Sequence, residues 1–267
     1  DGGSDDHNGD RHYWEVWHGK KPIEMYNKER SRFFSEYGFQ SFPEFESVKR
    51  YAPCEEDWNI YSEVMMSHQR GGAHANELIE TYLLNEYRKP RDFEAFLYMN
   101  HVLQGDAIKT AIEAHRRDMP YCMGTLFWQH NDCWPVASWA SRDYYGRWKA
   151  QHYFTRKAYR DMLVSPIADE SEILKVQVVS DRLKSCGGKL EVSVIKLTGE
   201  VLNQYNRNVK IDANSSRTLF SIPLEEALNG ARKEDVFVHA VLSTDKGKND
   251  YANNYFLVKQ KEVNYPH

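Results

Sequence analysis

Two patterns of hydrophobic and polar positions divide the chain near residues 165–170. Up to about residue 165, short apolar runs alternate with stretches in which apolar side chains recur every three or four residues. This order of strand and helix predicts parallel strands joined by crossover helices. After Pro166, apolar and polar positions alternate in short runs, which predicts an antiparallel β-sandwich. We therefore predict an α/β unit over residues 1–166 and an all-β unit over residues 167–267.

In the first part, helical spacing predicts helices over 75–87, over about 93–114 with a cap at Asp92, and over 147–163. Two short apolar runs, 32–34 and 125–128, are typical of strands. The first leads to Glu36 and the second ends at Trp128. Active sites of parallel α/β folds lie where such strands end, so these two residues are the first candidates for chemistry.

In the second part, three alternating runs and one continuous apolar run predict strands, and three stretches rich in glycine or charge predict turns between them. The strand runs are 174–178, 190–194, 236–240 and 255–258, and the turn stretches are 186–188, 198–199 and 245–248.

The charge balance and composition exclude several classes of function. Lys and Arg number 35 and Asp and Glu 39, a net charge of −4, so nothing favours binding to nucleic acid. No apolar run approaches the ~20 residues of a membrane span, and we expect no membrane partner. The four cysteines show no C-x-x-C spacing, which argues against zinc-ribbon and thioredoxin-like chemistry. Aromatic residues make up 13% of the chain and favour stacking surfaces or a large core.

A calcium or zinc site is not expected near the N-terminus. Residues 6–10 read D-x-N-x-D, but an EF-hand loop then needs Gly and Glu where this chain has Arg11 and Trp17. His7, His12 and His18 lack the spacing of a helical zinc site. We therefore predict no metal and no cofactor.

Glu36 and Trp128 together suit a sugar. An indole stacks on the apolar face of a sugar ring, and a carboxylate stabilises an oxocarbenium-like transition state. A glutamate that merely caps a strand or faces solvent is the structural alternative. Gln129, Asn131 and Asp132 follow Trp128 and would either reach sugar hydroxyls or cap the loop.

Two long motifs carry a family resemblance. The first is S-E-Y-G-F-Q-S-F-P at 35–43. The second is G-T-L-F-W-Q-H-N-D at 124–132, and it is followed by Trp134, S-W-A-S at 138–141, Y-G at 145–146, W-K at 148–149 and H-Y-F at 152–154. Together they resemble the β-mannosidases of glycoside hydrolase family 2. The resemblance implies a partial (β/α)8 TIM barrel, with strands 6, 7 and 8 at 10–18, 32–36 and 123–128, followed by an immunoglobulin-like β-sandwich. Strands 1 to 5 of the barrel would be missing.

The same resemblance implies roles for individual residues. Glu36 would be the nucleophile of a retaining exo-β-mannosidase, and Trp128 would be a platform for the sugar. Tyr13 and Trp14, at the end of strand 6, would approach the sugar or the nucleophile, and barrel packing is the alternative for both. No cofactor is needed, because two carboxyl groups fill both chemical roles.

The second carboxyl group, the acid/base, follows an asparagine upstream of strand 6 in the family. The pairs Asn76-Glu77 and Asn85-Glu86 lie inside predicted helices, and we expect them to face solvent. The chain by itself is therefore expected to be inactive on β-mannosides.

Other interpretations remain open at this point. Family 2 β-galactosidases and β-glucuronidases share the barrel and an E-Y motif, although both long motifs fit mannosidases better. The sandwich would otherwise be a carbohydrate-binding module or an interdomain spacer, but all seven tryptophans precede residue 149. The expected partners are a β-mannoside of mannan or N-glycan origin, the missing N-terminal part, and a second copy through exposed barrel edges. The start of the chain suggests an excised piece, and the resemblance favours an extracytoplasmic or lysosomal setting.

Overall fold

The computed structural model describes residues 9–72, 74–244 and 249–266, and these form two compact units. Residues up to His115 together with Tyr121–Ala158 make the first unit. Arg116–Pro120 and the chain from Tyr159 onward make the second. His7, most of the D-x-N-x-D pattern and the turn predicted at 245–248 lie outside the described residues.

Three extended segments run parallel in the first unit. Strand β1 (Arg11–His12) pairs in parallel with β2 (Phe34–Glu36). A parallel bridge from Phe34 to Thr125 adds a third segment, in which Leu126 N donates to Phe34 O at 2.8 Å. The predicted parallel arrangement is confirmed for these segments, and Glu36 stands at the end of the middle one.

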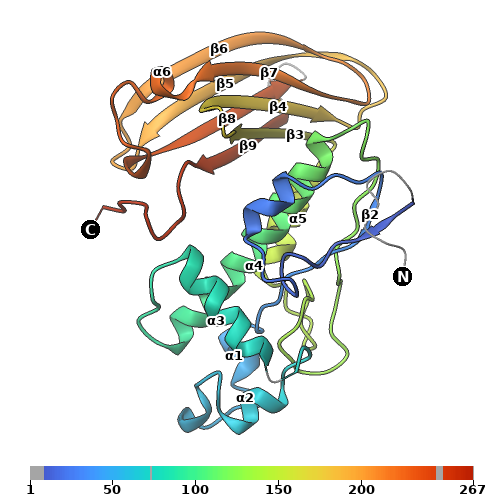
Figure 1. The fold of residues 1–267 in the computed structure, drawn as a ribbon, viewed down its shortest axis with the longest axis vertical. Coiled ribbons are helices and arrows are strands. Elements are labelled where there is room, and N and C mark those ends of the chain that lie inside the picture. Colours follow the sequence, from blue (N-terminus) through green and yellow to red (C-terminus); the bar gives the residue numbers. More distant parts are fainter. Residues whose placement is uncertain (1–8, 73, 245–248, 267) are drawn as a thin grey trace. The chain divides into compact units, whose positions relative to one another are not determined.

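Helices make up much of the rest of this unit (Figure 1). The α-helices are α1 (Phe45–Val48), α2 (Glu63–Ser67), α3 (His74–Glu86), α4 (Phe93–Arg117) and α5 (Ala150–Ala158), and the short 3-10 helices are Ile23–Asn27 and Glu55–Asp57. The cap predicted at Asp92 is confirmed, because its Oδ1 accepts a hydrogen bond from Ala95 N at 2.7 Å. The helix predicted over 147–163 is shorter, since the chain enters a strand at Met162.

Helix α3 corrects one expectation. Asn76 does not face solvent but is fully buried. Its Nδ2 donates to Ile60 O at 2.6 Å, and its Oδ1 accepts from Gln69 Nε2 at 2.5 Å. Asn85 is exposed as expected. Asn76 therefore holds the chain before α3 to the helix, a role that helical periodicity alone does not reveal.

Replacing Asn76 with Ala should destabilise the chain by about 1–3 kcal/mol, because the Ile60 carbonyl and the Gln69 amide would lose a buried partner. The matched control is Asn85→Ala, on the exposed face of the same helix, which should change stability by less than about 0.5 kcal/mol. Urea unfolding followed by circular dichroism at 222 nm measures both. Equal effects of the two substitutions would contradict this role for Asn76.

The second unit is a sandwich of two antiparallel sheets (Figure 1). One sheet has the order β3-β4-β7 and the other β6-β5-β8-β9. The strands are β3 (Met162–Ala168), β4 (Ile173–Ser180), β5 (Cys186–Lys196), β6 (Val201–Ile211), β7 (Ser215–Pro223), β8 (Val236–Thr244) and β9 (Asn249–Phe256), with a short helix α6 (Leu224–Leu228) and a 3-10 turn at Lys233–Asp235.

The alternating positions of the predicted strands form the core of this sandwich. Leu174, Val176 and Val178 of β4 are buried together with Val192 of β5 and Val238 of β8. Side chains of both sheets thus share one apolar interior, as a sandwich requires.

The architecture changes at Ala158–Tyr159, not between residues 166 and 167. Pro166 lies inside β3, at the edge of its sheet, where a residue without an N–H group is tolerated. The turn predicted at 186–188 is also wrong, because these residues begin β5. Gly188 suits the strand, since a Cβ there would lie 3.0 Å from Ser243 O of the paired strand β8. The turn at 198–199 is confirmed by the positive φ of Gly199.

Arg116–Pro120 contribute contacts within the second unit. Arg116 Nη2 lies 2.8 Å from Asp181 Oδ2, and the carbonyl of Arg117 accepts from Gln177 Nε2 at 2.7 Å and from Ser216 Oγ at 3.0 Å. Across the described parts of the chain, the helices are too short or too polar to span a bilayer.

Candidate functional site

The Glu36 carboxylate is fixed by a side chain from the neighbouring strand. Trp14 Nε1 donates a hydrogen bond to Glu36 Oε1 at 2.8 Å. His12 pairs with Glu36 in the register of β1 and β2, and its Nδ1 lies 3.7 Å from Oε2. The Glu36 side chain remains 26% exposed. One carboxylate oxygen is therefore held by an indole, while the group stays open to a ligand.

Trp128 lies beside the segment that carries Glu36. Its backbone N donates to Tyr37 O at 2.7 Å, and its side chain is 43% exposed. The peptide bond from Trp128 to Gln129 is cis. The structure thus brings the backbone of Trp128 next to the residue that follows Glu36, with an indole available for stacking.

Gly38 allows this close approach. A Cβ at this position would overlap the carbonyl oxygen of Trp128, and would lie 2.9 Å from Trp14 Cη2 and 3.0 Å from Trp139 Cδ1. Trp14 and Trp139 pack edge to face, with ring centroids 5.9 Å apart. Only a residue without a side chain fits between the Trp128 carbonyl and the rings of Trp14 and Trp139.

Tyr13 does not belong to this site. Its side chain is 1% exposed and packs edge to face against Tyr26 and Phe34, with ring centroids at 5.7 and 6.3 Å. Burial raises the pKa of its phenol above the ordinary value. The packing alternative holds for Tyr13, whereas Trp14 reaches the carboxylate.

The sequence contained a signal for this difference. Side chains alternate along extended backbone, so His12 and Trp14 point to one side and Tyr13 to the other. His12 was considered only as a metal ligand, and its place opposite Glu36 was missed. Among the described residues, no group of three or more His, Cys, Asp or Glu side chains is arranged to hold a metal ion.

The polar residues after Trp128 serve the loop itself. Gln129 Nε2 donates to Asn131 O at 3.1 Å. Asp132 is buried, and its Oδ1 accepts from Ser138 Oγ at 2.6 Å. These contacts favour the capping interpretation over direct contact with a sugar.

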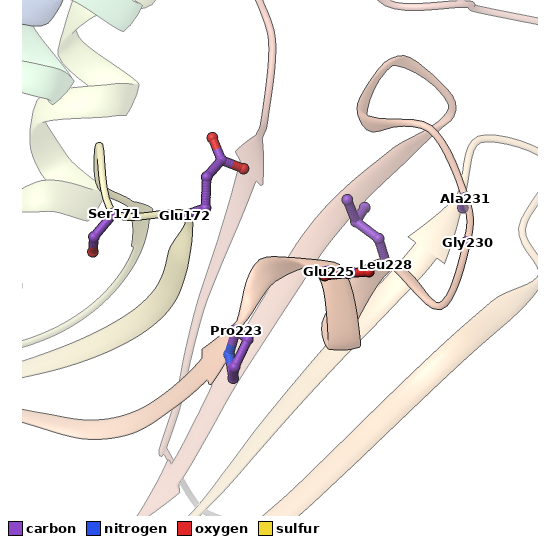
Figure 2. Close-up of a pocket in the computed structure, with 7 residues that line it drawn as sticks. All are labelled: Ser171, Glu172, Pro223, Glu225, Leu228, Gly230 and Ala231. Atoms are coloured by element: carbon purple, nitrogen blue, oxygen red, sulfur yellow. The ribbon is translucent and has the colours of Figure 1, made fainter.

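The sandwich contains a pocket of about 510 Å³, which none of the residues around Glu36 lines (Figure 2). It is lined by Ser171, Glu172, Pro223, Glu225, Leu228, Gly230 and Ala231, none of which is aromatic. The Glu172 carboxylate already accepts from Lys233 Nζ at 2.6 and 2.9 Å. The pocket therefore offers no stacking platform for a sugar ring, in contrast to the site around Glu36.

Comparison with known proteins shows what each part of the chain is similar to. The family model of the Mannosidase Ig/CBM-like domain matches residues 172–262. The β-mannosidase of Rattus norvegicus is 29% identical over 96% of this chain and 30% of its own length. The β-mannosidase of Capra hircus is 31% identical over 88% of this chain and 28% of its own length. The chain thus spans about 30% of the length of these relatives.

Solved structures extend the likeness to the fold. The β-D-mannosidase of Dictyoglomus thermophilum superposes with a TM-score of 0.88 and 32% identity, over 97% of this chain and 31% of that one. An exo-chitosanase of Amycolatopsis orientalis shares the fold, with a TM-score of 0.74 and 17% identity over 89% of this chain and 29% of that one. On these likenesses, the chain resembles about one third of the length of the β-mannosidases of glycoside hydrolase family 2.

Proposed function

We propose that this chain carries the nucleophile side of a retaining exo-β-mannosidase site, with Glu36 as the nucleophile and Trp128 as the sugar platform. The observation that supports this most is the Glu36 carboxylate, bound by Trp14 through one oxygen and still partly exposed, in a segment whose next residue, Tyr37, bonds to the backbone of Trp128. A carboxylate that merely ended a strand would not need an indole donor from the neighbouring strand.

The chemistry follows from this geometry. Trp14 engages Oε1, so Oε2 is the oxygen that attacks the anomeric carbon of a terminal β-mannoside. The bond to the leaving oxygen breaks as the new ester bond forms, and a second carboxyl group protonates that oxygen. The same group then removes a proton from water, whose oxygen attacks the anomeric carbon as the bond to Glu36 breaks, and mannose is released with retained configuration. Trp128 stacks against the sugar ring during both steps.

The three parallel segments are the end of a larger barrel in this proposal. The segments at 11–12, 34–36 and 124–126 lie in chain order, side by side, as strands 6, 7 and 8 of a (β/α)8 barrel would. In such a barrel, residues at the ends of different strands meet at one face. The acid/base carboxyl group comes from strand 4 in the family, outside residues 1–267. The β-sandwich that follows the barrel serves as a spacer between domains.

A chimera tests the proposal. In it, this chain replaces the 31% of the Dictyoglomus thermophilum β-D-mannosidase that it matches. We expect the chimera to hydrolyse p-nitrophenyl β-D-mannoside and to prefer it over the β-D-galactoside and β-D-glucuronide. We expect no turnover by the 267-residue chain, because retaining hydrolysis needs two carboxyl groups about 5–5.5 Å apart.

Each arm of this experiment has an outcome that contradicts the proposal. A folded chimera that prefers galactoside or glucuronide would reject the mannoside assignment. Turnover by the 267-residue chain would show that a carboxyl group within it acts as the acid/base.

A further inference from the structure

Lys149 is a buried cation that the proposed chemistry does not use. Its side chain is 1% exposed, although lysine is almost never fully buried unless it is paired. Its Nζ donates to two backbone carbonyls, Ser41 O at 2.8 Å and Ser138 O at 3.3 Å. Removing an ammonium from water is costly, so this placement calls for an explanation.

The two carbonyls belong to the two segments that form the candidate site. Ser41 follows Glu36 by five residues, and Ser138 lies in the loop that follows Trp128. The same two residues form an antiparallel bridge, in which Ser41 N donates to Ser138 O at 2.9 Å and Ser138 N donates to Ser41 O at 3.1 Å. The ammonium thus binds the oxygens that already join these segments.

Two acidic residues offset part of the cost of burying the ammonium. Asp132 and Asp143 both favour the charged form of Lys149, while burial, the larger effect, lowers its pKa to about 8. Asp132 is itself tied to Ser138, through Ser138 Oγ. His101 of α4 faces the same cluster, and burial together with the charge of Lys149 lowers its pKa to about 4. Burial thus opposes the charged form of both Lys149 and His101.

We propose that Lys149 is a positioning residue that sets the place of Trp128 relative to Glu36, by clamping the segment after Glu36 to the loop after Trp128. The clamp acts at a distance from both side chains. Trp128 touches the Glu36 segment through its bond to Tyr37 O and its contact with Gly38, and both contacts shift when the bridge at Ser41 and Ser138 shifts. The catalytic meaning of this placement rests on the proposed function, but the clamp itself does not.

Amide-hydrogen exchange in the 267-residue chain, measured by NMR, tests the clamp without any substrate. Lys149→Met removes the ammonium but keeps the length of the side chain. We expect the protection of the Trp128 amide, which Lys149 does not touch, to fall at least tenfold together with that of the Ser41 and Ser138 amides. Protection of the Leu83 amide in α3 should change less than twofold. The matched control is Lys109→Met, which removes an ammonium 3.6 Å from Glu113 and should leave all four amides within twofold of the parent.

Two results would overturn the clamp. One is unchanged protection of Trp128 in Lys149→Met, and the other is an equal fall at Trp128 and Leu83, which would indicate a general loss of stability. If Lys149→Met does not fold, the same exchange measurement on the unmodified chain at two pH values tests the clamp instead. Raising the pH from 6.5 to 9 neutralises Lys149, and the protection of Trp128 relative to Leu83 should then fall at least threefold. A constant ratio would reject the clamp. An inactive chimera with a positive exchange result would reject the proposed function and leave the clamp standing.

Discussion

Replacing Glu36 with Ala in the chimera is expected to lower kcat for p-nitrophenyl β-D-mannoside by about 10⁴-fold, because no other group can form the covalent intermediate. Initial rates at saturating substrate measure this loss. Sodium azide should restore part of the rate, since a small anion fits where the carboxylate was removed. The product should then be α-mannosyl azide, because azide attacks from the side that the carboxylate occupied.

The control for this experiment is Glu15→Ala. Glu15 follows Trp14 directly, but its carboxylate is half exposed and pairs with Lys21 at 3.3 Å. Its loss should change kcat by less than about twofold, as surface ion pairs contribute little. Full activity of Glu36→Ala, or a β-configured azide product, would remove Glu36 from the role of nucleophile.

The second large effect is expected from Gly38→Ala. The new methyl group would overlap the Trp128 carbonyl oxygen and crowd Trp14 and Trp139. Backbone cannot yield as a flexible side chain does, so the Glu36 and Trp128 segments must separate. We expect a loss of about 1–3 kcal/mol in unfolding free energy from overpacking. In the chimera we also expect kcat/KM to fall about 10²-fold, since a displacement of about 1 Å at a reacting centre has that effect.

Gly187→Ala is the matched control for the methyl group. Nothing lies within 4 Å of a Cβ at Gly187, in strand β5 of the sandwich. Urea unfolding and kinetics should both be nearly unchanged there. If Gly38→Ala kept full activity and stability, the close approach of the Trp128 carbonyl, Trp14 and Trp139 to Gly38 would not determine the geometry of the site.

Local patterns in the sequence predicted the parts of the fold that depend on neighbours along the chain. The alternating runs at 174–178 and 190–194 lie in strands β4 and β5, and the helical spacing at 75–87 and 93–114 corresponds to α3 and α4. Strands β3, β6 and β7 were missed. All three lie at sheet edges, and β6 leaves most of its side chains exposed. An edge strand shows no clear apolar alternation.

Within the candidate site, the sequence indicated only those residues that stand at the ends of predicted strands. Glu36 and Trp128 follow apolar runs, and the structure places their backbones close together. The burial of Tyr13, just after β1, agrees with alternation along extended backbone. The burial of Asn76 depends on partners at Gln69 and Ile60, which periodicity does not reveal. The same holds for Lys149, whose partners are carbonyls of segments 108 and 11 residues away.

The short stretch Arg116–Pro120 has a consequence for how such proteins recombine. It precedes the sandwich by some forty residues in the chain, yet Arg116 and Arg117 bond to Asp181, Gln177 and Ser216 of that unit. A gene segment beginning at Tyr159 would remove Arg116 from Asp181 and the Arg117 carbonyl from Gln177 and Ser216, although Gln177 Nε2 would still donate to Ser216 Oγ. The β-sandwich unit is therefore not encoded by one continuous stretch of sequence, and a domain exchange between enzymes should include Arg116–Pro120.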